Sequence, residues 1–157
     1  MENAGTRLLQ RPRDKNETDL ELALYYALEQ GFTRVVILAA LGGRLDQTLA
    51  NLALLTAPRL SALDMRLDDG QEEAWFTRRE AQVRGARGDV LSLIPWGGAV
   101  AGVRTQGLRW PLDGESLYPY KTRGISNEML GKTARLEIES GLLLLVHRRK
   151  SSNSDRV

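Results

Sequence analysis

The stretch Val35-Val36-Ile37-Leu38-Ala39-Ala40-Leu41-Gly42-Gly43-Arg44-Leu45-Asp46-Gln47 decides the fold. Its first four residues form a continuous apolar run, which is typical of a strand covered on both faces in a parallel sheet. Gly42-Gly43 ends this run, and a helix is expected to follow until about Pro58. One stripe of that helix carries Leu45, Leu49, Leu52 and Leu55. A strand, a glycine turn and a helix in this order indicate a parallel α/β unit.

A second helix is expected before this stretch. Thr18-Asp19-Leu20-Glu21 fits the capping-box pattern, in which a hydroxyl and a carboxylate satisfy amides of the first turn. Apolar residues follow at helical spacing, and Gly31 ends the helix. Further upstream, residues 7–10 are expected to form a short strand that Pro12 stops.

The pattern changes after Pro58. Asp68-Asp69-Gly70 predicts a hairpin turn between strands at 65–67 and 74–76. Short strand-like runs follow at 90–94, 100–104, 135–138 and 142–147, which favours an antiparallel sandwich or barrel. The predicted fold is therefore α/β followed by all-β: a partial Rossmann-like domain over 1–60, a β-sandwich over 61–148, and a disordered tail over 149–157.

Composition sets limits on function. The chain has 157 residues, 42% of them hydrophobic and 27% charged, as in a globular protein. It lacks cysteine and has one histidine, which excludes disulfides, thiolate metal sites and a multi-histidine zinc site within the chain. The net charge of +2 does not indicate nucleic-acid binding. The apolar runs are too short to span a bilayer, so we expect a cytoplasmic protein without a membrane partner.

Three segments carry residues suited to chemistry. In the first, Lys15 precedes a helix N-terminus, where unpaired amides favour anions, and Asp19 could hold Mg²⁺ beside a phosphate. Acidic residues in a first helical turn more often serve only to cap the helix. In the second, Gly42-Gly43 follows a strand at the place where open α/β sheets bind ligands. Arg44 offers a planar fork to phosphate oxygens, and Asp46 could orient the arginine or a metal-bound water.

The third segment lies in the β half. Trp110 could stack on a flat heterocycle, and Ser126 and Asn127 could hydrogen-bond the edge of that ring. The pattern alone favours a core tryptophan at position 110. Ser126-Asn127 could equally form an Asx turn or a serine turn.

Taken in order, these segments resemble the thiamine pyrophosphokinase family. The resemblance rests on Asp14-Lys15-x-x-Thr18-Asp19-x-Glu21-x-Ala23, Gly42-Gly43-Arg44-x-Asp46-Gln47-x-x-Ala50-Asn51, Gly107-Leu108-Arg109-Trp110-Pro111-Leu112, and Ser126-Asn127-Glu128. It runs from about residue 6 to about residue 147. It implies a homodimeric enzyme that uses ATP and Mg²⁺ to convert thiamine into thiamine diphosphate and AMP, with thiamine near the dimer interface.

The resemblance also implies a role for each matching residue. Asp19 is implied as a metal ligand, and Arg44 and Asp46 as members of the reaction centre together with Asp19. Lys15, Thr18 and Gln47 are implied on the nucleotide side. Ser126, Asn127 and Trp110 are implied in the thiamine pocket.

One expected part of the family pattern is missing. Nothing before Asp14 resembles the Gly-Asp-x-Asp-Ser block, which supplies further Mg²⁺-binding carboxylates in the family. We therefore expect an N-terminally truncated and catalytically incomplete chain. Two alternatives stay open: a non-catalytic module that binds thiamine or nucleotide, and an interaction protein. The latter would use an exposed sheet edge or a basic stripe of Arg78, Arg79, Arg84 and Arg87.

Overall fold

The computed structural model describes residues 16–150. Two helices and the first two strands form the part of the chain that we call the α/β part. Its elements are α1 (Asp19–Glu29), β1 (Arg34–Leu38), α2 (Leu45–Leu54), a 3₁₀ turn η1 (Pro58–Leu60) and β2 (Asp64–Asp68). β1 and β2 pair in parallel, with Arg34 opposite Asp64 and Leu38 opposite Asp68. A parallel strand pair is therefore present, but its second strand contains residues 65–67, which were expected only in the antiparallel β half.

The remaining strands form what we call the two-sheet part. They are β3 (Glu72–Thr77), β4 (Glu80–Arg84), β5 (Val90–Pro95), β6 (Val100–Gln106), β7 (Asp113–Leu117), β8 (Asn127–Glu128), β9 (Thr133–Glu137) and β10 (Leu143–Arg148). The hairpin predicted at Asp68–Gly70 joins β2 to β3, and the four later runs predicted from the pattern appear as β5, β6, β9 and β10. The pattern did not predict β4, β7 or β8.

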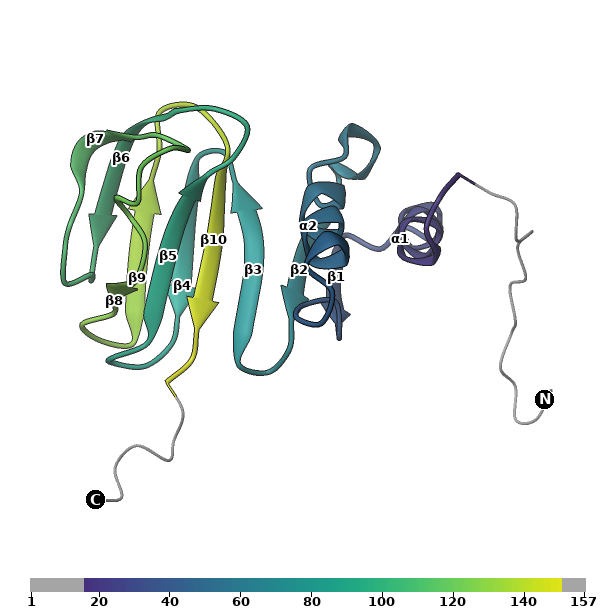
Figure 1. The fold of residues 1–157 in the computed structure, drawn as a ribbon, viewed down its shortest axis with the longest axis horizontal. Coiled ribbons are helices and arrows are strands. Elements are labelled where there is room, and N and C mark those ends of the chain that lie inside the picture. Colours follow the sequence, from purple (N-terminus) through teal and green to yellow (C-terminus); the bar gives the residue numbers. More distant parts are fainter. Residues whose placement is uncertain (1–15, 151–157) are drawn as a thin grey trace, which may run out of the picture.

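One mixed sheet connects the two parts. It has six strands in the order β1-β2-β3-β10-β5-β8, and a second sheet has four strands in the order β4-β9-β6-β7. β10 is the last strand of the described residues, yet it pairs antiparallel with both β3 and β5 in the interior of the six-stranded sheet. The helices lie at one end of the molecule and β6, β7 and β8 at the other (Figure 1).

Each face of the six-stranded sheet packs against a different layer. One face carries Leu67, Ala74 and Leu144 into an apolar cluster that also contains Leu24 of α1 and Leu52 of α2. The opposite face meets the four-stranded sheet in a second cluster. Its members include Trp75, Val83, Leu91, Leu93, Val103, Leu136, Leu143 and Leu145. Alternation along each strand sends neighbouring side chains to these two different cores.

The helix at 19–29 begins as predicted, but only half of the capping box forms. The hydroxyl of Thr18 accepts a hydrogen bond from the backbone N–H of Glu21 at 3.2 Å. The Glu21 carboxylate does not return to Thr18; it accepts a hydrogen bond from the Tyr25 hydroxyl at 2.6 Å. One side-chain cap therefore stabilises this helix start.

The structure corrects two expectations about burial. β1 was expected to be covered on both faces, but only Ile37 is buried, and Val36 and Leu38 are exposed. The α2 stripe is likewise split, because Leu52 is buried whereas Leu45 and Leu49 are exposed. These four apolar side chains are therefore left largely uncovered by the rest of residues 16–150.

A strand was predicted near the N-terminus and a disordered tail at the C-terminus. The strand expected at 7–10 lies outside the described residues, as do 151–157 of the expected tail. Arg149 and Lys150 were placed in that tail, but both are held: the Arg149 N–H donates to the Gln71 carbonyl at 2.8 Å and the Lys150 N–H to Asp89 at 2.8 Å. The division near residue 60 stays a prediction.

Candidate functional site

The turn after β1 is built by residues of α2. The Thr48 hydroxyl donates to the Gly42 carbonyl at 3.1 Å, and the Asn51 amide donates to the Ala40 carbonyl at 3.1 Å. Gly42 and Gly43 both have positive φ, 77° and 69°, which glycine adopts at little cost. The two helix side chains thus fix an exposed loop at the carboxyl ends of the parallel strands, the edge where such sheets bind ligands.

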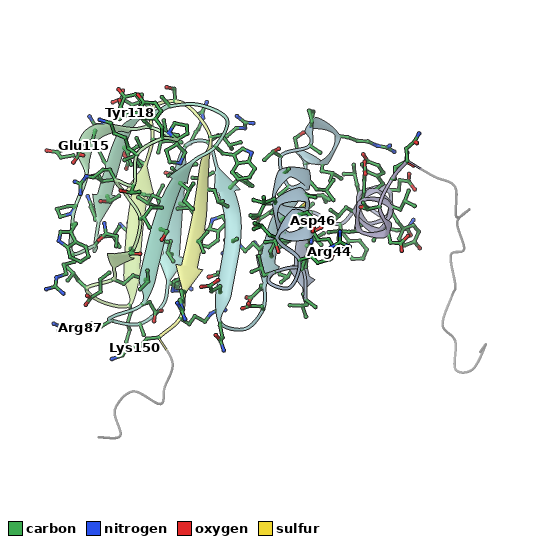
Figure 2. All side chains as sticks on the ribbon, viewed as in Figure 1. Arg44, Asp46, Arg87, Glu115, Tyr118 and Lys150 are labelled. Atoms are coloured by element: carbon green, nitrogen blue, oxygen red, sulfur yellow. The ribbon has the colours of Figure 1, made fainter. Side chains whose placement is uncertain are left out.

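Arg44 and Asp46 form a bidentate pair in this loop. Arg44 Nε donates to Asp46 Oδ1 at 3.1 Å, and Arg44 Nη2 donates to Oδ2 at 2.5 Å. The hydrogen bond from Arg44 holds the pKa of Asp46 below its ordinary value, so this carboxylate stays ionised. Figure 2 shows both side chains together beside α2. The expectation that Asp46 orients the arginine is met, and the guanidinium keeps N–H donors for an anion.

The other described residues expected near the nucleotide lie at the N-termini of the two helices. Thr18 and Asp19 are exposed at the N-terminus of α1, and Gln47 is exposed in the first turn of α2. Lys15 lies outside the described residues. The approach of the Lys15–Asp19 stretch to the Gly42–Asp46 stretch stays a prediction.

The carboxylate side chains of the described residues supply only part of a Mg²⁺ site. Residues 16–150 contain no group of three His, Cys, Asp or Glu side chains arranged to hold a metal ion. Mg²⁺ in phosphoryl-transfer sites takes one or two protein carboxylates and completes its shell with phosphate oxygens and water. Asp19 suits one such ligand, but the described residues do not form a complete magnesium site by themselves.

The predicted aromatic site lies in the two-sheet part. Trp110 is 49% exposed, so the interpretation as a core tryptophan, which the pattern favoured, is wrong. The Arg109 guanidinium lies 5.2 Å from the Trp110 ring centre and also pairs with Glu128 at 3.1 Å. The ring is thus available to stack on a flat ligand.

Ser126 and Asn127 differ in their availability. Ser126 is exposed, with φ of 56°, and its N–H donates to Ser92 Oγ at 3.0 Å. Asn127 is only 3% exposed, and its side-chain amide bonds the backbone of Trp110. Asn127 therefore sits beside Trp110 as predicted, but its amide group faces protein.

Backbone strain coincides with both candidate sites. Within the described residues, only Ala39 and Ser126 combine a side chain with positive φ, 58° and 56°. Such conformations are costly without glycine and often occur at functional sites. Ala39 directly follows β1, and Ser126 directly precedes β8. No pattern in the sequence predicts this strain.

The two candidate sites lie far apart in one chain. β1, which leads to Arg44, and β8, which contains Asn127, are the opposite edge strands of the six-stranded sheet. Five strand spacings of about 4.8 Å separate them by roughly 24 Å. A single chain therefore cannot bring both groups onto one small molecule.

A buried charged cluster was missed by the sequence reasoning. His147 is 1% exposed; its Nδ1 lies 2.9 Å from Glu73 Oε1 and its Nε2 lies 2.8 Å from Asp89 Oδ2. Hydrogen bonding to Glu73 raises the pKa of His147 against the effect of burial, and Asp89 adds to the rise. Both nitrogens face carboxylates, so the imidazole carries both protons. Arg149 extends the cluster to Asp68 of β2 at 2.8 Å. The cluster joins strands, and its burial indicates a structural role.

The basic stripe is divided. Arg78 and Arg79 lie before β4, whereas Arg84 and Arg87 lie at and beyond its other end, about 16 Å along the strand. These side chains do not form one continuous patch.

Among the described helices, none is long and apolar enough to cross a membrane.

The fold thus defines a protein class in which an α/β unit with an exposed arginine turn is joined to paired sheets that carry an exposed tryptophan. Two family models match the chain in order. "Thiamin pyrophosphokinase, catalytic domain" covers residues 1–67, and "Thiamin pyrophosphokinase, vitamin B1 binding domain" covers 77–143. The chain belongs to the thiamine pyrophosphokinase family.

Individual relatives agree. A Bacillus subtilis thiamine pyrophosphokinase is 28% identical over 148 residues, covering 93% of this chain and 69% of the relative. Thiamine pyrophosphokinase 1 of Oryza sativa subsp. japonica is 26% identical over 150 residues, covering 90% and 57%. The chain thus spans between about half and two thirds of these curated relatives' lengths.

Solved structures share the fold. The crystal structure of thiamine pyrophosphokinase from Bacillus subtilis superposes with a TM-score of 0.79 at 27% identity, covering 87% of this chain and 65% of that one. The enzyme from Geobacillus thermodenitrificans gives 0.78 at 27% identity, covering 90% and 66%. The mixed sheets with few helices therefore match this family's fold.

Proposed function

We propose that this protein acts in thiamine pyrophosphorylation, transferring a pyrophosphoryl group from ATP to thiamine. The observation that carries the proposal is the ordered match of both family domains, together with a fixed Arg44–Asp46 pair at the carboxyl edge of parallel strands. We also infer that the α/β part is a partial Rossmann-like unit and the two-sheet part a β-sandwich, as the family resemblance implies.

The reaction places different demands on the two sites. The thiamine hydroxyl loses its proton and bonds to the β-phosphorus of ATP, while the bond from that phosphorus to the α-phosphate oxygen breaks and AMP leaves. Arg44 would bind phosphate oxygens through the N–H groups that Asp46 does not use. Thr18 and Gln47 would lie on the nucleotide side. Mg²⁺, with Asp19 as one ligand, would neutralise phosphate charge.

The aromatic site would receive the thiamine ring system. Trp110 would stack on it, and Ser126, whose side chain is exposed, would hydrogen-bond its edge. Because this site and Arg44 lie at opposite edges of one sheet, we propose that each complete site combines the α/β part of one subunit with the two-sheet part of another. A homodimer supplies two such sites.

Release of AMP tests the activity. Full-length chain is incubated with ATP, Mg²⁺ and thiamine, and AMP is measured with and without thiamine. Thiamine-dependent AMP supports the proposed reaction and overturns the expectation of an incomplete chain. Calorimetric binding of thiamine without AMP supports a binding module instead. The absence of both binding and AMP contradicts the proposal.

Mixing two variants tests the shared site. Arg44→Ala and Trp110→Ala damage different halves of the composite site, so each homodimer should lose activity, by about 100-fold for the arginine. Co-refolded chains form mixed dimers with one intact site each, and activity should recover to about a quarter of the original by random pairing. Recovery no higher than that of the separate variants would contradict a site shared between subunits.

A further inference from the structure

The side chain of Asn127 is committed to the backbone of Trp110. Its Oδ1 accepts the Trp110 N–H at 3.0 Å, and its Nδ2 donates to the Trp110 carbonyl at 2.7 Å. Oδ1 also accepts the Glu128 N–H at 3.0 Å. With only 3% of the residue exposed, little of the amide remains for a ligand.

Backbone hydrogen bonds hold the loop before Trp110 only as far as Arg109. The Leu130 N–H donates to the Gly107 carbonyl and the Arg109 N–H to the Glu128 carbonyl, both at 2.9 Å. Gly107 also lets the chain pass close to the start of β9, because a Cβ there would lie 2.4 Å from the Thr133 carbonyl oxygen. The next backbone step is interrupted, since Ser126 turns to positive φ and donates its N–H to Ser92. The Asn127 side chain supplies both hydrogen bonds that the Trp110 backbone receives.

Core packing does not hold the Trp110 ring. Half of this residue is exposed. The Arg109 guanidinium lies beside its ring, but Arg109 is itself mostly exposed and pairs with Glu128. An exposed indole keeps one orientation only if its backbone is fixed. Asn127 provides that restraint with a group shaped like a peptide bond, which can donate and accept in one plane.

We infer that Asn127 is a positioning residue, which holds the Trp110 backbone so that the indole face is presented to the ligand, and that Asn127 does not itself contact the substrate heterocycle. The inference rests on the proposed function for the identity of the ligand, thiamine. It replaces the direct hydrogen bond to the heterocycle that the sequence suggested for Asn127. Ser126 then remains the polar group of this pair that faces solvent.

A substitution of similar shape separates the two roles. Asn127→Asp keeps both acceptor bonds but sets a carboxylate oxygen against the Trp110 carbonyl, where a donor is required. The control Gln106→Glu makes the same amide-to-acid change at an exposed residue just before the loop. Full-length chains labelled with 5-fluorotryptophan are compared by ¹⁹F NMR, with Trp110→Phe assigning the Trp110 signal among the three tryptophans. Thiamine affinity is measured by calorimetry on the same samples.

We expect Asn127→Asp to shift or broaden the Trp110 signal without ligand, to leave the buried Trp75 signal in place, and to weaken thiamine binding about tenfold. Gln106→Glu should change neither measurement. An unchanged Trp110 signal in Asn127→Asp overturns the inference, and a tenfold loss of affinity beside it would indicate direct contact with thiamine. If the parent chain does not bind thiamine, the proposed function fails, but the Trp110 signal still tests the positioning role. Asn127→Ser provides the second variant if the aspartate variant does not fold, as the Trp75 signal would reveal.

Discussion

The two parts of the molecule use similar numbers of apolar side chains in different ways. In the two-sheet part, Leu91, Leu93 and Leu145 are fully buried between the sheets. In the α/β part, Val36 is 53% exposed and Leu45 is 71% exposed. Both nevertheless belong to apolar patterns as regular as those of the strands in the two-sheet part. Apolar periodicity predicts which side chains share a face, but it does not predict what covers that face. Both parts expose some apolar side chains, but those of the two-sheet part lie in loops, whereas the α/β part exposes them on a strand and a helix.

The largest effect is expected at the buried charged cluster of the two-sheet part. His147→Ala leaves Glu73 and Asp89 buried without their shared cation, which should lower the free energy of unfolding by about 3–5 kcal/mol. Urea unfolding measures the loss. Arg148→Ala, next in the strand but mostly exposed beside Glu72, should cost less than about 1 kcal/mol. Equal losses in the two variants would contradict a special role for the buried cluster.

Two leucine truncations compare the parts directly. Leu145→Ala removes a fully buried side chain between the sheets and should cost about 2–5 kcal/mol. Leu45→Ala removes an exposed side chain of α2 and should change stability by less than about 0.5 kcal/mol. Thermal or urea unfolding of both variants gives the difference. A cost for Leu45→Ala as large as that for Leu145→Ala would show that something covers α2 in solution.

The buried cluster also predicts how stability depends on pH. The pKa of His147 is raised, so its contribution is complete below the unfolded value of about 6.5 and is lost as pH rises through the folded pKa. The pKa of Glu73 is lowered chiefly by its hydrogen bond to His147, so its contribution is present above about 4.5 and is lost as pH falls. Burial raises the pKa of Asp89, but the Lys150 and Ala86 N–H groups and His147 outweigh it and leave that pKa lowered.

The free energy of unfolding should therefore be largest between these two pH values. Outside them it should fall by at most about 1.4 kcal/mol per pH unit for each titrating group. Urea midpoints from pH 4 to pH 9 test the shape. His147→Ala should flatten the decline above neutral pH. If the variant keeps the parent's alkaline decline, the titration belongs to other groups.

A smaller and local effect is expected at the start of α1. Thr18→Ala removes the hydroxyl that caps the Glu21 N–H and should cost about 1 kcal/mol, felt mainly in the α/β part. Hydrogen exchange should show faster exchange of the first amides of α1 and unchanged exchange in β10. Thr56→Ala is the matched control, because the Thr56 hydroxyl bonds only the Ala53 carbonyl after α2. Faster exchange throughout both parts would contradict a local effect.

Much of the fold could be predicted because its signals are local. The capping hydroxyl at Thr18, the glycine turn after β1 and the hairpin at Asp68–Gly70 each depend on a few adjacent residues. β7 was missed because Asp113–Leu117 is mostly polar, and β8 because it has only two residues. The place of β10 between β3 and β5 depends on pairing between distant segments, which no local pattern encodes.

The same distinction applies to the candidate sites. The Arg44–Asp46 pair was predictable, because residues two apart at a helix start can face one another. The bond between Asn127 and the Trp110 backbone spans 17 residues and exists only once the two loops pair. The role of His147 was hidden for the same reason, since its carboxylate partners lie 74 and 58 positions away.

The interior position of β10 has a consequence for how the chain is made. A ribosome delivers β3 and β5 well before Leu143–Arg148, so neither strand can meet its shared neighbour until that later segment has been made. During that interval both strands offer unpaired backbone edges to other nascent chains. The arrival of β10 should therefore protect both edges at once, and the six-stranded sheet should close only after that strand has emerged.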